Sequence, residues 1–209
     1  MAIKKSADAP ASKPVSTPAV AAPALMVFAS TYLPTYGHGA IVVARANGTK
    51  SDTATFLVDA HCLGVRRATR ATVPTLGFLG KVLPALDKEH HTAPIAADVA
   101  LAILTGAVSF AKSAGFPPAL GYEEALEIFG SLEPGAAGLK FGKAGKPHFH
   151  PMPGDDEEFA EEILGKLRRS VGPYGFTYDL DELEEDHLDG DDDAESEDGE
   201  SPGGAEEAW

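Results

Sequence analysis

Three residues with reactive side chains stand close together in the stretch 59–62, which reads D-A-H-C. A cysteine thiolate is a nucleophile when a histidine takes its proton and a carboxylate orients that histidine, so Asp59, His61 and Cys62 are candidate catalytic residues. If the stretch is a strand, however, His61 and Cys62 point to opposite faces. We favour the alternative that Asp59 caps the turn at 62–64 and that Cys62 is a small buried apolar residue.

A second group with possible chemistry is the pair His148 and His150. On a strand, residues two apart share a face, so both rings can bind one divalent metal such as Zn²⁺. Asp155 and Asp156 are candidate oxygen ligands, and His38 or His61 would be a distant fourth ligand. The alternative is that these histidines are ordinary solvated side chains on a hairpin.

Basic residues form two short groups along the chain. They are Arg66, Arg67 and Arg70 in the first group, and Lys140, Lys143 and Lys146 in the second. Contacts from such residues to phosphates give binding that depends on salt and not on nucleotide sequence. These six residues are therefore the predicted binding surface for a polyanion such as nucleic acid, or for a partner protein.

The negative charge of the chain is concentrated at one end. The net charge is −15, with 17 Lys and Arg against 32 Asp and Glu, but 179–209 contains 16 acidic residues and no Lys or Arg. The rest of the chain is nearly neutral, so the net charge does not exclude a polyanionic partner. We expect the acidic segment to improve solubility or to compete for the basic surface as an intramolecular mimic of a polyanion.

Composition predicts one folded domain between two disordered ends. Residues 1–24 are rich in Pro and Ala, and 179–209 combines like charges with Gly, so neither has enough apolar surface to offset the entropy of ordering. Trp209 at the end of the acidic segment is a possible short anchor. Residues 25–178 suit a single domain. With one cysteine and no apolar run near the roughly 20 residues of a membrane span, we expect a cytoplasmic protein without membrane contact.

The periodicity of the middle segment predicts an α+β fold. Apolar, β-branched runs at 40–44 and 54–58 flank Asn47-Gly48 and indicate a β-hairpin. Helical spacing at 93–114 predicts a long, largely buried helix, and a short helix is expected at 122–129. A second hairpin is expected around 143–145. Asp155 with Glu158 predicts the capped start of a C-terminal amphipathic helix. Because the strands come in adjacent pairs, the pairing should be mainly antiparallel.

Two segments resemble a family of uncharacterised bacterial proteins. Residues 56–66, F-L-V-D-A-H-C-L-G-V-R, resemble its F/Y-L-V-D-x-x-C-L-G-V-K/R segment. Residues 141–147, F-G-K-A-G-K-P, with 153–156, P-G-D-D, resemble its F-G-K-x-G-K-P…P-x-D-D segment, and 111–117 resembles the end of its helix. The resemblance covers about residues 38–170 and implies a bacterial origin and one fold. It implies no activity, and the histidines stand outside its pattern.

These observations favour a regulatory or interaction protein that contacts a polyanion or a partner protein through its basic loops. The alternative is a metal-dependent hydrolase or nuclease that uses Asp59, His61, His148, His150 and Asp155.

Overall fold

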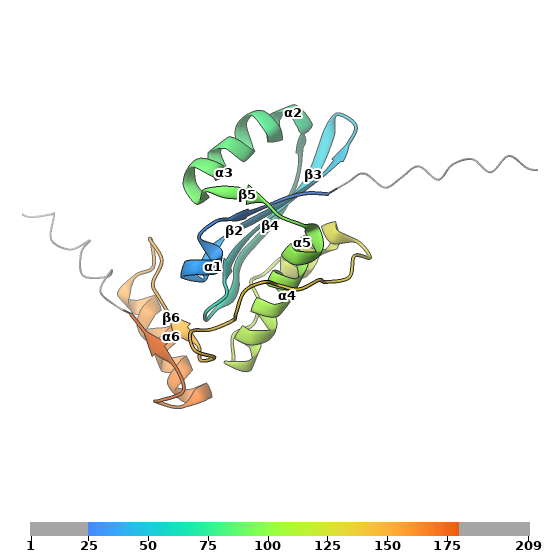
Figure 1. Ribbon diagram of the computed structural model, residues 1–209. Helices are drawn as coiled ribbons and strands as arrows, with labels where there is room; N and C mark the ends of the chain where they lie inside the picture. Colours follow the sequence, from blue (N-terminus) through green and yellow to red (C-terminus); the bar gives the residue numbers. More distant parts are fainter. Residues whose placement is uncertain (1–24, 180–209) are drawn as a thin grey trace, which may run out of the picture.

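The computed structural model describes residues 25–179 (Figure 1). The two terminal segments predicted to be disordered, including Trp209, lie outside the described residues, except for Asp179. Within the described part, the predicted α+β class is confirmed by one antiparallel sheet with helices on both faces.

The sheet has five antiparallel strands in the order β4-β3-β2-β1-β5. The strands are β1 (Leu25–Ser30), β2 (His38–Asn47), β3 (Lys50–Asp59), β4 (Gly64–Pro74) and β5 (Thr92–Pro94). The hairpin predicted at 40–58 is β2 and β3, paired over their full length. Its turn consists of Gly48 and Thr49, and Gly48 adopts a φ of 64°, a backbone conformation that glycine favours.

Helices cover both faces of the sheet (Figure 1). They are α1 (Leu33–Tyr36), α2 (Thr75–Gly77), η1 (Phe78–Val82), α3 (Leu83–His90), α4 (Ala97–Ser113), α5 (Tyr122–Leu126), η2 (Glu127–Phe129) and α6 (Glu157–Val171). The main core lies between one sheet face and α4 and α5, and includes Ile41, Phe56 and Leu104. The run α2–η1–α3 covers part of the other face, where Phe78 packs on Val42.

The C-terminal part of the domain is built on α6. It forms a second cluster in which Phe149 and Leu167 are fully buried. The short strands β6 (His148–Phe149) and β7 (Thr177–Tyr178) pair in parallel beside it. The second predicted hairpin is reduced to a turn that a single bridge between Lys143 and Lys146 closes. The tight turn is present, but the flanking residues Gly142 and His148 donate their N–H groups to the carbonyls of Ala60 and His61 instead of extending the hairpin.

The structure corrects one boundary and one capping residue, and it adds elements that were not predicted. The long helix begins at Ala97 and not at residue 93, because Thr92–Pro94 pairs with β1 as β5. The residue that caps α6 is Asp156 and not Asp155, since the Asp156 carboxylate accepts the N–H of Phe159 at 2.8 Å. Residues 65–92, for which no element was predicted, form most of β4 and the run from α2 to α3. No helix among residues 25–179 has the length and apolar character needed to cross a membrane.

Candidate functional site

Asp59 ends β3 and organises the turn that follows. Its carboxylate accepts the backbone N–H groups of His61 at 2.9 Å, Cys62 at 2.8 Å and Leu63 at 3.0 Å, which confirms the predicted capping role. Burial raises the pKa of Asp59, while these three hydrogen bonds and Arg66 act in the opposite direction. Cys62 is fully buried, and burial raises the pKa of its thiol far above the usual range, so the thiol stays protonated. A protonated, buried thiol is a packing group and not a nucleophile.

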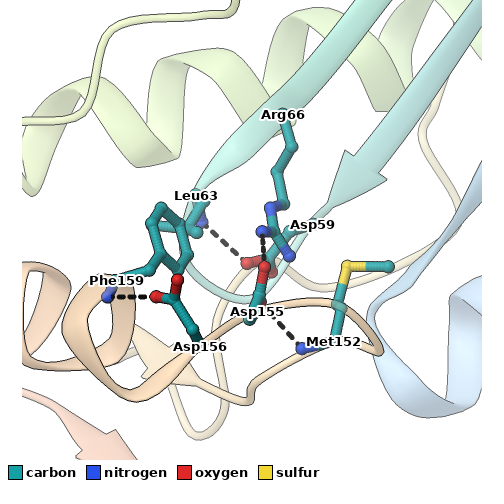
Figure 2. Close-up of polar contacts among 7 residues, drawn as sticks. All are labelled: Asp59, Leu63, Arg66, Met152, Asp155, Asp156 and Phe159. Carbon is teal, nitrogen blue, oxygen red and sulfur yellow. Dashed lines mark hydrogen bonds and ion pairs between the residues drawn. The ribbon is translucent and has the colours of Figure 1, made fainter.

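Arg66 and Asp155 form an ion pair that joins β4 to the start of α6 (Figure 2). The Nη2 atom of Arg66 lies 2.5 Å from Oδ1 of Asp155, and the two side chains are only 14% and 10% exposed. The other carboxylate oxygen of Asp155 accepts the N–H of Met152 at 2.8 Å. The guanidinium also lies 5.3 Å from the centre of the Phe159 ring, a cation–π contact. Both the predicted binding residue and the predicted metal ligand are thus engaged in holding α6.

Replacing Arg66 with alanine is expected to lower the free energy of unfolding by about 2 kcal/mol, because the Asp155 carboxylate loses its partner in a largely buried position. Urea denaturation followed by circular dichroism measures this loss. Arg67→Ala is the matched control, since Arg67 is exposed and its replacement should change stability by less than about 0.5 kcal/mol. Equal stability of the two variants would contradict a structural role for Arg66.

The other predicted basic residues lie on different elements. Arg70 donates to Glu127 and to the carbonyl of Glu124, which fixes α5 to β4. Lys146 donates to the carbonyl of Tyr174 at 3.0 Å. Arg67 and Lys140 are exposed. Lys143 is the member of the set whose ammonium group lies beside histidines, 3.4 Å from Nε2 of His148.

Four of the seven histidines meet at the end of the sheet where β2 begins and β3 ends. The rings of His38 and His150 are stacked with centres 5.7 Å apart, and those of His61 and His148 are 6.2 Å apart. His61 is close enough to the other three and to Lys143 to be affected by their charges. We call these five residues the histidine–lysine cluster: His38, His61, Lys143, His148 and His150.

Backbone contacts between distant segments hold this cluster together. The N–H of His148 donates to the carbonyl of His61 at 2.9 Å, and the N–H of Gly142 donates to the carbonyl of Ala60 at 3.0 Å. The His61 ring packs directly on Gly37, where a Cβ atom would lie 2.2 Å from Nδ1 of that ring. Gly37 also has a φ of 77°, so both its conformation and its lack of a side chain suit this position.

Asp179 places a carboxylate in the middle of the histidine–lysine cluster. Its Oδ2 atom lies 3.1 Å from Nε2 of His148, 3.7 Å from Nδ1 of His150 and 3.9 Å from Nζ of Lys143. The parallel pairing of β6 with β7 determines this position, because the N–H of Asp179 donates to the carbonyl of Phe149 at 3.1 Å. The first residue of the acidic segment therefore occupies the cluster as an anionic ligand would.

The environment keeps the inner histidines neutral at neutral pH. Burial lowers the pKa of His61 and of His148, and the neighbouring cationic groups lower both further. Asp179 acts on His148 in the opposite direction. The Nδ1 atom of His148 is 2.8 Å from Oγ1 of Thr177, so the orientation of this ring is fixed. Such a group of nitrogen donors suits an anionic oxygen, and its positive charge increases as the pH falls.

The comparisons with known proteins give no relative. No protein-family model, no curated protein and no solved structure matches this chain. The resemblance to a bacterial family therefore depends only on the short segments at 56–66, 111–117, 141–147 and 153–156.

The structure brings some of the predicted metal ligands together and separates others. His148 and His150 face the carboxylate of Asp179, and His38 and His61 lie beside them. In contrast, Asp155 forms an ion pair with Arg66, and Asp59 accepts hydrogen bonds from the turn that follows it. Within residues 25–179, no group of three or more His, Cys, Asp or Glu side chains has an arrangement that could hold a metal ion. A divalent metal at His148 and His150 stays a prediction.

Sequence reasoning missed Asp179 and Thr177 as members of this site. Thr177 begins β7, a strand of two residues with no periodic pattern, and Asp179 directly follows this strand. Both residues reach the histidines through the pairing of this segment with β6. The available signal was the position of Asp179 as the first residue of the acidic segment, which directly follows the predicted domain.

Proposed function

We propose that this protein binds polyanions at the histidine–lysine cluster and that its C-terminal acidic segment competes for the same site. The observation that supports the proposal is the position of Asp179, whose Oδ2 atom lies within 3.9 Å of three cationic or protonatable groups. A carboxylate oxygen and a phosphate oxygen accept the same hydrogen bonds and respond to the same positive charge. A phosphate that replaces Asp179 would meet the same donors.

The expected contact surface is the histidine–lysine cluster and not the full set of six basic residues. Arg66, Arg70 and Lys146 already have partners within the domain, so they are weaker candidates for binding a ligand. Lys143 is 60% exposed and Asp179 is 50% exposed, whereas His148 is 5% exposed. Because the Asp179 carboxylate lies 3.1 Å from Nε2 of His148, we expect an anionic ligand to reach this ring by displacing the Asp179 side chain.

The chain joins the 15 further acidic residues of 180–209 to Asp179, so we expect them to raise the effective concentration of carboxylates for this site. This competition is intramolecular, so it weakens the binding of an external polyanion without any change in the binding site itself. It should also become weaker as salt screens the charges.

The test compares four full-length or shortened proteins for binding of fluorescently labelled inorganic polyphosphate. They are the wild type, Asp179→Asn, a chain that ends at Asp179, and Asp179→Asn in that shortened chain. We expect each change alone to tighten binding about fivefold at low salt and the two together to have the largest effect. Glu133→Gln is the matched control, because it removes one negative charge from an exposed position in the loop after η2.

The salt dependence separates site binding from a general charge effect. Polyphosphate affinity should decrease steeply between about 50 mM and 200 mM salt, and replacing Lys143 with Ala should reduce that slope by about one. Unchanged affinity in both Asp179→Asn and the shortened chain, or an equal gain in Glu133→Gln, would overturn the proposal.

A further inference from the structure

A continuous row of aromatic rings leads away from the histidine–lysine cluster. Ring centres are 5.1 Å apart between His91 and Tyr32, 5.8 Å between Tyr32 and Tyr36, and 6.1 Å between Tyr36 and His38. The row ends at His150, whose ring is stacked on that of His38 at an angle of 9° between the planes. We call His91, Tyr32, Tyr36, His38 and His150 the aromatic row.

The aromatic row is built from segments that the fold brings together. Tyr32 immediately precedes α1 and Tyr36 ends it, while His91 follows α3 and is one of two non-glycine residues, within 25–179, with a positive φ. The N–H of Thr31 donates to the carbonyl of His91 at 2.9 Å, which joins the end of β1 to the end of α3. These backbone contacts position the rings independently of any ligand.

The tyrosines of the aromatic row are not core residues. Tyr32 is 42% exposed and Tyr36 is 59% exposed, although both are large and mostly apolar. Large aromatic side chains contribute most to stability when they are buried. Two exposed tyrosines that contact each other therefore contribute little to the stability of the core. They present ring surface to solvent beside a site for anionic oxygens, and a single-stranded nucleic acid has both chemical features that such a surface would meet.

We propose that the polyanion is a single-stranded nucleic acid, whose phosphates lie at the histidine–lysine cluster and whose bases stack on the aromatic row. This inference depends on the proposed polyanion binding for its phosphate contacts and adds the contacts to the bases. Unpaired bases expose their faces and stack on aromatic side chains, whereas a duplex keeps its bases stacked on one another. His38 and His150 belong to both groups and connect the two kinds of contact.

The experiment measures fluorescence anisotropy with full-length protein and four probes. They are an oligouridylate of about ten nucleotides, a thymidine deoxyoligonucleotide of the same length, a duplex of the same length, and inorganic polyphosphate. We expect both single strands to bind more tightly than the duplex. The RNA and DNA probes show which sugar is preferred, since the 2′-hydroxyl is the group that distinguishes them. Duplex binding as tight as single-strand binding would overturn the inference.

Variants of Tyr36 distinguish the contribution of base stacking from that of electrostatic attraction to the phosphates. Tyr36→Ala should weaken oligouridylate binding about tenfold and leave polyphosphate binding unchanged, because only the first ligand has bases. Tyr36→Phe keeps the ring and should retain wild-type affinity. Tyr174→Ala is the matched control, because Tyr174 is 87% exposed and lies outside the aromatic row.

The two proposals fail in different ways. If polyphosphate binds as proposed but Tyr36→Ala does not weaken oligouridylate binding, the base-stacking inference is wrong and polyanion binding stands. If polyphosphate binds neither the wild type nor Asp179→Asn, the proposed function itself is wrong. Circular dichroism and thermal melting of Tyr36→Ala confirm that the variant is folded, so a loss of binding reports on the ring.

Discussion

Replacing Asp59 with alanine is expected to lower the free energy of unfolding by about 4 kcal/mol, because three backbone N–H groups lose their common acceptor. The three donors belong to His61, Cys62 and Leu63, and Asp59 itself is only 7% exposed. Buried N–H groups without a partner are rare in folded proteins because each one costs free energy. The turn is therefore expected to rearrange or to admit water, and His61 would leave the histidine–lysine cluster.

Urea denaturation of the wild type and three variants measures this effect. Asp59→Asn keeps one carbonyl oxygen as an acceptor and should lose about half as much stability as Asp59→Ala. Asp52→Ala, on the same strand, removes a carboxylate whose hydrogen bond to Thr72 is exposed, and should cost less than about 1 kcal/mol. If Asp59→Ala and Asp52→Ala cost the same, the capping role has no energetic importance.

The turn at Asp59 could be predicted from sequence because its determinants are local. An aspartate after an apolar strand and before Cys-Leu-Gly has few ways to satisfy the next N–H groups other than its own carboxylate. The β2–β3 hairpin was predictable for the same reason, since a glycine turn lies between two β-branched runs. The long helix α4 was predictable from its apolar periodicity, although pairing of β5 with β1 shortened it at the start.

The elements that sequence missed depend on contacts between distant segments. β4 is an edge strand with exposed Arg67, Thr69 and Arg70, so its residues do not alternate between apolar and polar in a recognisable way. The run α2–η1–α3 leaves Leu76 84% exposed, and its apolar residues do not follow a clear helical face. Tertiary packing against Val42 and Ala44, and not local periodicity, makes this run helical.

The candidate site was predictable in its residue types but not in its assembly. The H-x-H spacing placed His148 and His150 on one side, and the basic loop pointed to Lys143. The meeting of these residues with His38 and His61 requires the contact between the segment at 142–148 and the turn after β3, which joins positions about eighty residues apart in the sequence. No periodicity or spacing in the sequence predicts such a contact. The aromatic row also joins distant segments, so it could not be predicted from the sequence either.

Acidification from about pH 7.5 to about pH 5.5 is expected to tighten polyphosphate binding about thirtyfold at constant salt. Burial and the neighbouring cationic groups lower the pKa of His61 and of His148 below 6.5, so both rings are neutral at the higher pH. A bound polyanion favours their charged forms, and each proton taken up on binding strengthens affinity up to tenfold per pH unit. The groups that face these rings are His38, Lys143, His150 and Asp179.

Stability without a ligand should change in the opposite direction. Because the folded-state pKa of both histidines lies below the value of 6.5 for the unfolded chain, the unfolded chain binds more protons as the pH falls. Their contribution to stability is complete above pH 6.5 and is lost as the pH falls from 6.5 towards the folded-state values. Thermal melting should therefore show a lower Tm at acidic pH, and polyphosphate should restore it.

The double variant His61→Gln/His148→Gln tests the origin of both effects. Its affinity for polyphosphate should depend much less on pH, and its Tm should fall less on acidification. His90→Gln is the control, because His90 lies outside the cluster and its replacement should leave both properties as in the wild type. Affinity that is constant or decreases as the pH falls would contradict a role for these rings in anion binding. A Tm that falls in acid and rises on addition of polyphosphate, only when both histidines are present, would link the stability of the fold to occupation of the histidine–lysine cluster.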